Sequence, residues 1–189
     1  MKAMNYQDYI WDLGGTLLDN YELSTQAFLK TLEEFNLSGD HDAVYQKLKE
    51  STDSAVTTFA LQEPLFLASY KKNEASRLAD PVWAKGCHEI LHKIVSEGSR
   101  NFLISHRDNQ VLLLLKQAHL SPYFTEVITA SDGFKRKPSP ESLLYLKEKY
   151  DICSGLVIGD REIDKEAGQA AGFDTLLVDG KKSLLETVN

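Results

Sequence analysis

The stretch YIWDLGGTLLD, residues Tyr9 to Asp19, decides how the rest of the chain is interpreted. An apolar run that ends at glycines is typical of a buried strand, here Tyr9 to about Leu13. Gly14 and Gly15 allow the backbone to turn tightly and to approach a ligand closely. We therefore expect Asp12 at the carboxyl end of a strand, where open α/β sheets bind their ligands. A carboxylate there serves as a nucleophile or as a ligand of a hard metal ion, although an Asp that only begins a turn fits this stretch equally well.

The composition is that of an ordinary soluble globular protein, with 42% hydrophobic and 26% charged residues among 189. This length fits one large domain or one domain with a small insertion. A net charge of −7 argues against a surface for nucleic acid or anionic membranes, and no apolar run approaches membrane-spanning length. The N-terminus carries no apolar signal segment, and Cys87 and Cys153 are expected to be buried thiols of a reducing compartment. We therefore expect a cytoplasmic protein, a monomer or weak dimer, with no nucleic-acid or membrane partner.

Five short apolar runs predict strands: Tyr9–Leu13, Phe102–Ser105, Val127–Ala130, Leu156–Gly159 and Thr175–Val178. Helical patterns separate them, among them a leucine-rich helix over 111–120 that we expect to lie well inside the core. Strands that alternate with helices are typical of βαβ units. The prediction is an α/β fold with a mostly parallel sheet.

Some ninety residues without a strand pattern separate the first two strands, although a crossover needs only a dozen or so plus short loops. The excess predicts a helical insertion over 20–80 in a core domain formed by 1–19 and 81–189. Its first helix, Asn20–Phe35, is expected to be capped by Asp19 with Glu22 as the reciprocal partner. A second short helix is expected around Val44 to Leu48, and another from Pro64 toward Leu78.

Polar residues follow four of the predicted strands. Asp12 follows the first, Ser105 and His106 the second, Lys137 the third and Asp160 the fourth, with Asp164 four residues later. Each alone fits an ordinary turn or helix start. Together they supply carboxylates for Mg²⁺, a hydroxyl for a phosphate and a lysine that neutralises charge. Phosphoryl transfer needs this set, because its catalysis consists mostly of positioning and charge stabilisation.

In these four motifs the chain resembles the haloacid dehalogenase-like (HAD) hydrolase superfamily. The first motif reads Asp12-Leu13-Gly14-Gly15-Thr16, the second ends in Ser105, the third is Lys137 before a proline, and the fourth contains Asp160 and Asp164. The helical insertion resembles the family's small cap domain. The arrangement is most similar to the phosphoglycolate phosphatase and β-phosphoglucomutase-like branch.

The resemblance implies a Rossmann-like core in which the first and fourth strands are adjacent. It also implies that Asp12 attacks phosphorus and forms an aspartyl-phosphate. Mg²⁺ would be held by Asp12, the backbone carbonyl of Gly14 and Asp160, with Asp164 near the metal or orienting Lys137.

The phosphoryl group would be bound by a second set of residues, namely Ser105, His106, Lys137 and Gly15. The implied activity is a Mg²⁺-dependent phosphatase for a small phosphorylated metabolite, with a cap that closes over the site and excludes water.

The chain departs from the family pattern at Gly14, where family phosphatases carry a second Asp that transfers protons. General acid–base help contributes ~10²–10⁴-fold to rate. Three alternatives therefore stay open: a phosphatase of reduced activity, a phosphate-binding or regulatory protein without catalysis, and a changed reaction such as phosphonate or haloacid cleavage. The phosphonate route needs a cap lysine, for which Lys30, Lys47 and Lys49 are candidates. His106, where the family often has Asn, is a candidate to donate the missing proton.

Overall fold

The computed structural model describes residues 6–77 and 81–188. The chain divides into two compact units. The α/β unit comprises Met1–Leu18 and Trp83–Asn189, and the helical unit comprises Asp19–Val82. Among the described residues, no helix is both long and apolar enough to cross a membrane.

The α/β unit is built on one parallel sheet of five strands in the order β3-β2-β1-β4-β5. The strands are β1 (Asp8–Asp12), β2 (Arg100–Ile104), β3 (Phe124–Ile128), β4 (Gly155–Gly159) and β5 (Asp174–Leu177). The predicted α/β fold with a Rossmann-like parallel sheet is confirmed, and so is the pairing of the first and fourth strands. Each predicted strand lies within three residues of the observed one.

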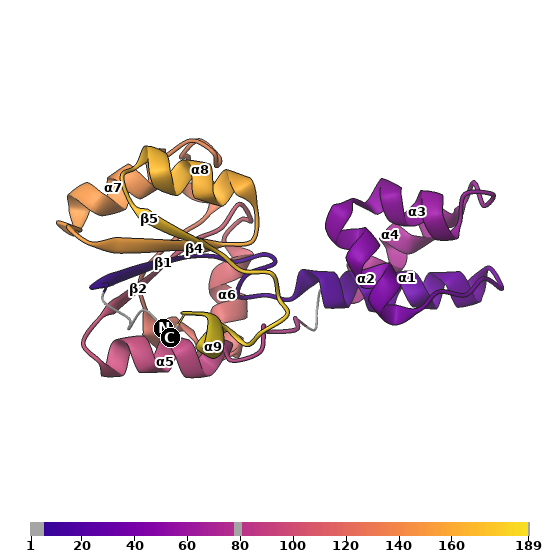
Figure 1. Ribbon diagram of the computed structural model, residues 1–189, viewed down its shortest axis with the longest axis horizontal. Coiled ribbons are helices and arrows are strands. Elements are labelled where there is room, and N and C mark those ends of the chain that lie inside the picture. The colour runs from indigo at the N-terminus through magenta and orange to yellow at the C-terminus, as the bar shows by residue number, and fades with distance from the viewer. Residues whose placement is uncertain (1–5, 78–80, 189) are drawn as a thin grey trace. The chain divides into compact units, whose positions relative to one another are not determined.

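Helices cover both faces of this sheet (Figure 1). On one face lie α5 (Cys87–Ser96), α6 (Gln110–Gln117) and α9 (Leu184–Val188), and on the other lie α7 (Glu141–Lys149) and α8 (Glu162–Ala170). Two short 3₁₀ turns, Ser121–Tyr123 and Ala130–Asp132, flank β3. Because both faces are covered, the central strands are buried on both sides. This explains why they form continuous apolar runs in the sequence.

Strand β1 shows how the two faces are filled. Its side chains alternate across the sheet, so that Tyr9 and Trp11 pack into the core under α5 and α6. Ile10 packs into the opposite core with residues of α7 and α8. All five residues of β1 are buried, and this fixes the position of Asp12 at its end.

Two predictions about burial are wrong. The helix predicted over 111–120 is α6, which ends at Gln117, and two of its leucines are well exposed, Leu112 at 47% and Leu113 at 57%. A helix that covers one face of a sheet buries one stripe, here Val111 and Leu115, and leaves the residues between them outside. Cys87 is buried as expected, but Cys153 is exposed, because it lies in the loop before β4.

The helical unit has its own core. It contains α1 (Asn20–Glu34), α2 (His41–Glu50), α3 (Thr52–Phe59) and α4 (Phe66–Arg77), of which α3 was not predicted. The Phe28 ring lies at the centre, with ring centroids 4.8 Å from Phe66 and 5.2 Å from Tyr70. The predicted end of the last helix, Leu78, lies outside the described residues.

The predicted N-cap of α1 forms only in part. The Asp19 carboxylate accepts a hydrogen bond from the Glu22 amide at 3.0 Å. The reciprocal bond from Glu22 does not form, because its side chain instead bonds Gln26 and His41.

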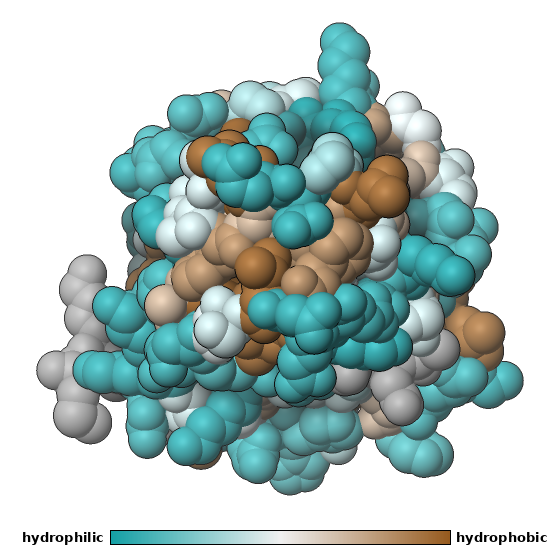
Figure 2. All heavy atoms as spheres, turned by 90° about the vertical axis from the view of Figure 1, so that its right-hand side faces the viewer, coloured by the Kyte–Doolittle hydropathy of each residue, from teal (hydrophilic) through white to brown (hydrophobic). Residues whose placement is uncertain are grey.

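The helical unit also exposes Leu61 and Leu65 between α3 and α4. Figure 2 shows hydrophobic surface bordered by hydrophilic residues on the side of the molecule that faces the viewer.

Candidate active site

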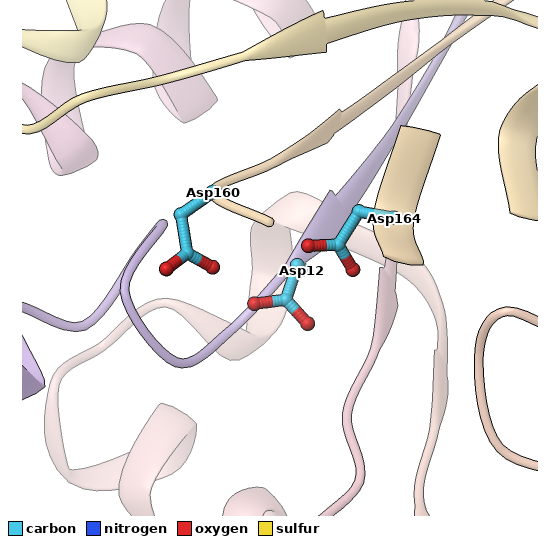
Figure 3. A group of neighbouring side chains, drawn as sticks. All are labelled: Asp12, Asp160 and Asp164. Carbon is cyan, nitrogen blue, oxygen red and sulfur yellow. The ribbon is translucent and has the colours of Figure 1, made fainter. Parts of the chain in front are cut away.

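Three carboxylates converge at the carboxyl ends of β1 and β4 (Figure 3). Asp12 is the last residue of β1, Asp160 directly follows β4, and Asp164 lies in the first turn of α8. One oxygen from each of the three lies within 4.8 Å of the others. The parallel pairing of β1 with β4 brings them together, because it places both strand ends at the same edge of the sheet.

Two glycines make room for this cluster. A Cβ atom at Gly15 would collide with the Asp160 carboxylate, and one at Gly159 would collide with Asp164. Gly15 also has a φ of 88°, a conformation that side-chain-bearing residues avoid. Its amide donates to the Leu18 carbonyl at 2.8 Å, so Gly15 serves the turn and the packing against Asp160.

Lys137 reaches the cluster from the loop after β3. Its ammonium donates a hydrogen bond to Asp12 and lies 2.5 Å from Asp164 Oδ1. The Lys137 side chain is 3% exposed, so both ion pairs are shielded from water. Asp164 also accepts the Arg161 amide at 3.1 Å, which fixes the start of α8.

The electrostatics of the cluster favour a divalent cation. Burial raises the pKa of the Asp12 carboxyl, Asp164 adds to the rise, and Lys137 opposes it. Asp12 Oδ2 is buried and has no hydrogen-bond partner among the described residues. A buried carboxylate oxygen without a donor is costly, and hard cations prefer carboxylate oxygens. These residues therefore fit a magnesium ion, which would act on the Asp12 pKa in the same direction as Lys137.

Ser105 and His106 follow β2 on the other side of β1. Ser105 is buried and its hydroxyl oxygen accepts the Arg107 amide at 3.1 Å. His106 Nε2 accepts the Lys137 amide at 3.1 Å. That bond requires a lone pair on Nε2, so the ring is neutral with its proton on Nδ1.

The surroundings of His106 favour the same neutral form. Burial, Lys137, Arg136 and Arg161 together lower its pKa to about 4, against a smaller opposite effect of Asp164. His106 therefore ties the loop that carries Lys137 to the end of β2, a contact that the sequence did not predict.

The structure also shows features that could not be predicted from the sequence. A cavity of about 260 Å³ opens beside Ser105 and His106 and is also lined by Phe134, Lys135 and Arg136. Thr16, in the first motif, has a buried hydroxyl without a hydrogen-bond partner among the described residues. Gly14 pairs with Leu18 in an isolated parallel bridge, and its φ is not among the positive ones.

The arrangement of these motifs agrees with the result of sequence comparison. The profile of the haloacid dehalogenase-like hydrolase family matches residues 9–178. The chain belongs to this family. The resemblance inferred from the four motifs is thereby confirmed, and the chain is a HAD-like hydrolase.

Several relatives of this HAD-like hydrolase are known. A hydrolase from Streptococcus pneumoniae TIGR4 of known crystal structure is 57% identical, with a TM-score of 0.89 over 97% of this chain and 96% of that one. The phosphoglycolate phosphatase of Nitrosospira multiformis is 29% identical over 88% of this chain and 80% of its own length. The pyrophosphatase PpaX of Oceanobacillus iheyensis is 24% identical over 93% and 84%, respectively.

Proposed function

We propose that this HAD-like hydrolase is a Mg²⁺-dependent phosphatase of a small phosphorylated metabolite that acts through an aspartyl-phosphate on Asp12. The observation that carries the proposal is the buried Asp12 carboxylate, with one oxygen bonded to Lys137 and the other without a donor. Phosphatases among the relatives support the same reaction class.

In the proposed reaction, an oxygen of the Asp12 carboxylate attacks phosphorus, the leaving group departs, and water then hydrolyses the aspartyl-phosphate and restores the Asp12 carboxylate. The Lys137 ammonium neutralises charge on the phosphoryl group and holds Asp12 in place. The Ser105 hydroxyl, whose oxygen already accepts a hydrogen bond from an amide, donates a hydrogen bond to a phosphoryl oxygen. His106 supports binding by holding the amide of Lys137.

The metal would be held by Asp12, Asp160 and Asp164 with the backbone carbonyl of Gly14. When bound, it supplies positive charge that offsets the three carboxylates and the phosphate. The need for that charge is clear from the cluster, in which three carboxylates outweigh the cations of Lys137 and Arg161.

We propose that the helical insertion, residues 20–80, is the cap that excludes water from the site. The chain leaves the α/β unit at Leu18 and returns at Trp83, and these two residues form an antiparallel bridge. Both connections therefore meet the α/β unit at the end of the turn that follows Asp12. Two of the lysines considered for the phosphonate route have partners within the helical unit: Lys47 pairs with Glu50, and the Lys49 ammonium lies over the Tyr21 ring.

One observation favours a second function. Gly14 has no side chain to transfer a proton, which fits a protein that binds a phosphate ligand without turnover, or one with changed chemistry such as phosphonate or haloacid cleavage. The buried Lys137, which pairs with both Asp12 and Asp164, favours catalysis, because a scaffold gains little from two buried ion pairs.

A panel of phosphate monoesters and anhydrides, assayed with Mg²⁺ and with EDTA, tests the proposal. We expect phosphate release that requires Mg²⁺ and that is lost in Asp12→Asn, which keeps the size of the side chain but removes its charge. Equal release by wild type and Asp12→Asn would contradict the nucleophile. Binding of inorganic phosphate without turnover of any substrate would support the second function.

A further inference from the structure

We infer that the substrate of this site is a phosphoric anhydride, an acyl phosphate or a pyrophosphate, and not an alkyl phosphate ester. The inference rests on the proposed function and names its substrate class. Its basis is the bonding of the side chains around Asp12: Gly14 offers no acid, and His106 and Lys137 are held in bonds that leave them no proton to give to a leaving group.

The leaving group decides whether a proton is needed. An alkyl ester expels an alkoxide, which is strongly basic and departs slowly unless an acid protonates it in the transition state. An acyl phosphate expels a carboxylate, whose conjugate acid has a pKa of about 4, and a pyrophosphate expels phosphate. Both depart as weakly basic anions without help from the protein.

The turn directly after Asp12 offers no acid, because residues 14 and 15 are both glycines. Gly14 lies two residues after Asp12, the last residue of β1, and forms the isolated parallel bridge with Leu18. In place of an acid, the chain offers only backbone at this point. The neighbouring residue Gly15 is also without a side chain, since Asp160 occupies that space.

The remaining polar groups are committed to other bonds. His106 Nε2 accepts from the Lys137 amide, so the ring is neutral, and a neutral imidazole N–H is not an acid near neutral pH. The Lys137 ammonium is shared by the carboxylates of Asp12 and Asp164. Transfer of its proton would leave both carboxylates without their counter-ion in a buried site.

Two further side chains are poor acids by their chemistry. The guanidinium of Arg161 acts on Asp12 electrostatically but stays charged throughout the accessible pH range. The Ser105 hydroxyl is a hydrogen-bond donor and not a source of protons for an alkoxide. The α/β unit therefore binds and positions a phosphoryl group but leaves the leaving group unprotonated.

With an anhydride as substrate, each of the two steps expels a weakly basic anion that needs no proton. In the first, an Asp12 oxygen forms a bond to phosphorus, the bond from phosphorus to the bridging oxygen breaks, and the carboxylate or phosphate leaves with the electron pair. In the second, water forms the new bond to phosphorus and the Asp12 carboxylate leaves with its electron pair. The protons of that water stay on the released phosphate and in solvent, so neither step draws a proton from the protein.

The experiment compares four substrates at fixed Mg²⁺: acetyl phosphate, pyrophosphate, p-nitrophenyl phosphate and phosphoglycolate. We expect kcat/KM to fall as the leaving group becomes more basic, with phosphoglycolate slower than acetyl phosphate by ~10²-fold or more, the lower end of what a general acid supplies. Phosphoglycolate should still compete with acetyl phosphate as an inhibitor, since its phosphoryl group fits the site. Comparison of the two anhydrides shows which of them is preferred.

Asp12→Asn serves as the blank for spontaneous hydrolysis of acetyl phosphate. Turnover of phosphoglycolate within ~10-fold of acetyl phosphate would overturn the inference and leave the phosphatase proposal standing, and a donor from the helical unit would produce that result. If none of the four substrates is turned over faster than by Asp12→Asn, the proposed function itself would be overturned. The two failures are thus distinguishable.

Discussion

Gly14→Asp is the change that tests the missing acid most directly. It adds a carboxyl two residues from Asp12, which forms one carboxylate cluster with Asp160 and Asp164. Neighbouring negative charges raise the pKa of an added carboxyl, and a raised pKa suits a general acid near neutral pH. We expect the substitution to accelerate the turnover of an alkyl phosphate in the presence of Mg²⁺.

The magnitude follows from the chemistry and the backbone. General acid–base catalysis contributes ~10²–10⁴-fold, or about 3–5 kcal/mol in the barrier. The backbone imposes little cost, because the left-handed conformation falls on Gly15, with a φ of 88°, and not on Gly14. Replacing a glycine at an ordinary φ even stabilises a protein by roughly 0.4–1 kcal/mol through the unfolded chain. A gain of ~10²-fold on an alkyl ester is therefore expected.

The assay is the turnover of phosphoglycolate and p-nitrophenyl phosphate by wild type, Gly14→Asp and Gly14→Asn. Asparagine matches aspartate in size and has no proton to give, so it separates proton transfer from packing. The gain should be large for the alkyl ester in Gly14→Asp, small for the aryl ester, and absent in Gly14→Asn. If Gly14→Asp folds, binds Mg²⁺ and is no faster than Gly14→Asn on phosphoglycolate, the missing-acid reasoning is refuted.

Three further predictions follow from the geometry of the site. Gly15→Ala should abolish turnover and weaken Mg²⁺ binding, measured by calorimetry, because its Cβ collides with Asp160, a carboxylate that we propose as a metal ligand. The control Gly98→Ala, at φ 83° with nothing within 4 Å, should show only the small stability loss of a left-handed alanine. Lys137→Met should destabilise the metal-free protein by roughly 3–5 kcal/mol in urea denaturation, because it leaves two buried carboxylates without a counter-ion; an unchanged midpoint would contradict the buried ion pairs. The pKa of His106 lies below its ordinary 6.5, at about 4, so the unfolded state binds the proton more tightly and stability falls as pH drops through that interval. His106→Asn keeps an acceptor for the Lys137 amide and does not titrate, so its thermal midpoint should depend less on pH between 6.5 and 4, whereas identical pH profiles would show that His106 does not contribute.

Much of the α/β fold was predictable from the sequence because its central strands, β1, β2 and β4, are buried on both faces. Such strands form continuous apolar runs, and Tyr9 to Leu13 is the clearest of them. Because polar residues directly follow these runs, the sequence also predicted that they lie together at one edge of the sheet. Helix α3 and the C-terminal α9 were not predicted, because each is too short to show a clear helical spacing of apolar residues.

By itself, the sequence determined which strand ends carry polar groups, since a switch from apolar to polar residues is local along the chain. Only the tertiary structure decided what those groups bond to. The Lys137 ammonium meets Asp12 across 125 residues of sequence, and the Lys137 amide meets the His106 ring across 31. Exposure of Leu112 and Cys153 was likewise settled by which neighbours pack against them. The physical reason is that hydrogen bonds and burial depend on distances in space, which chain periodicity constrains only within one helix or strand.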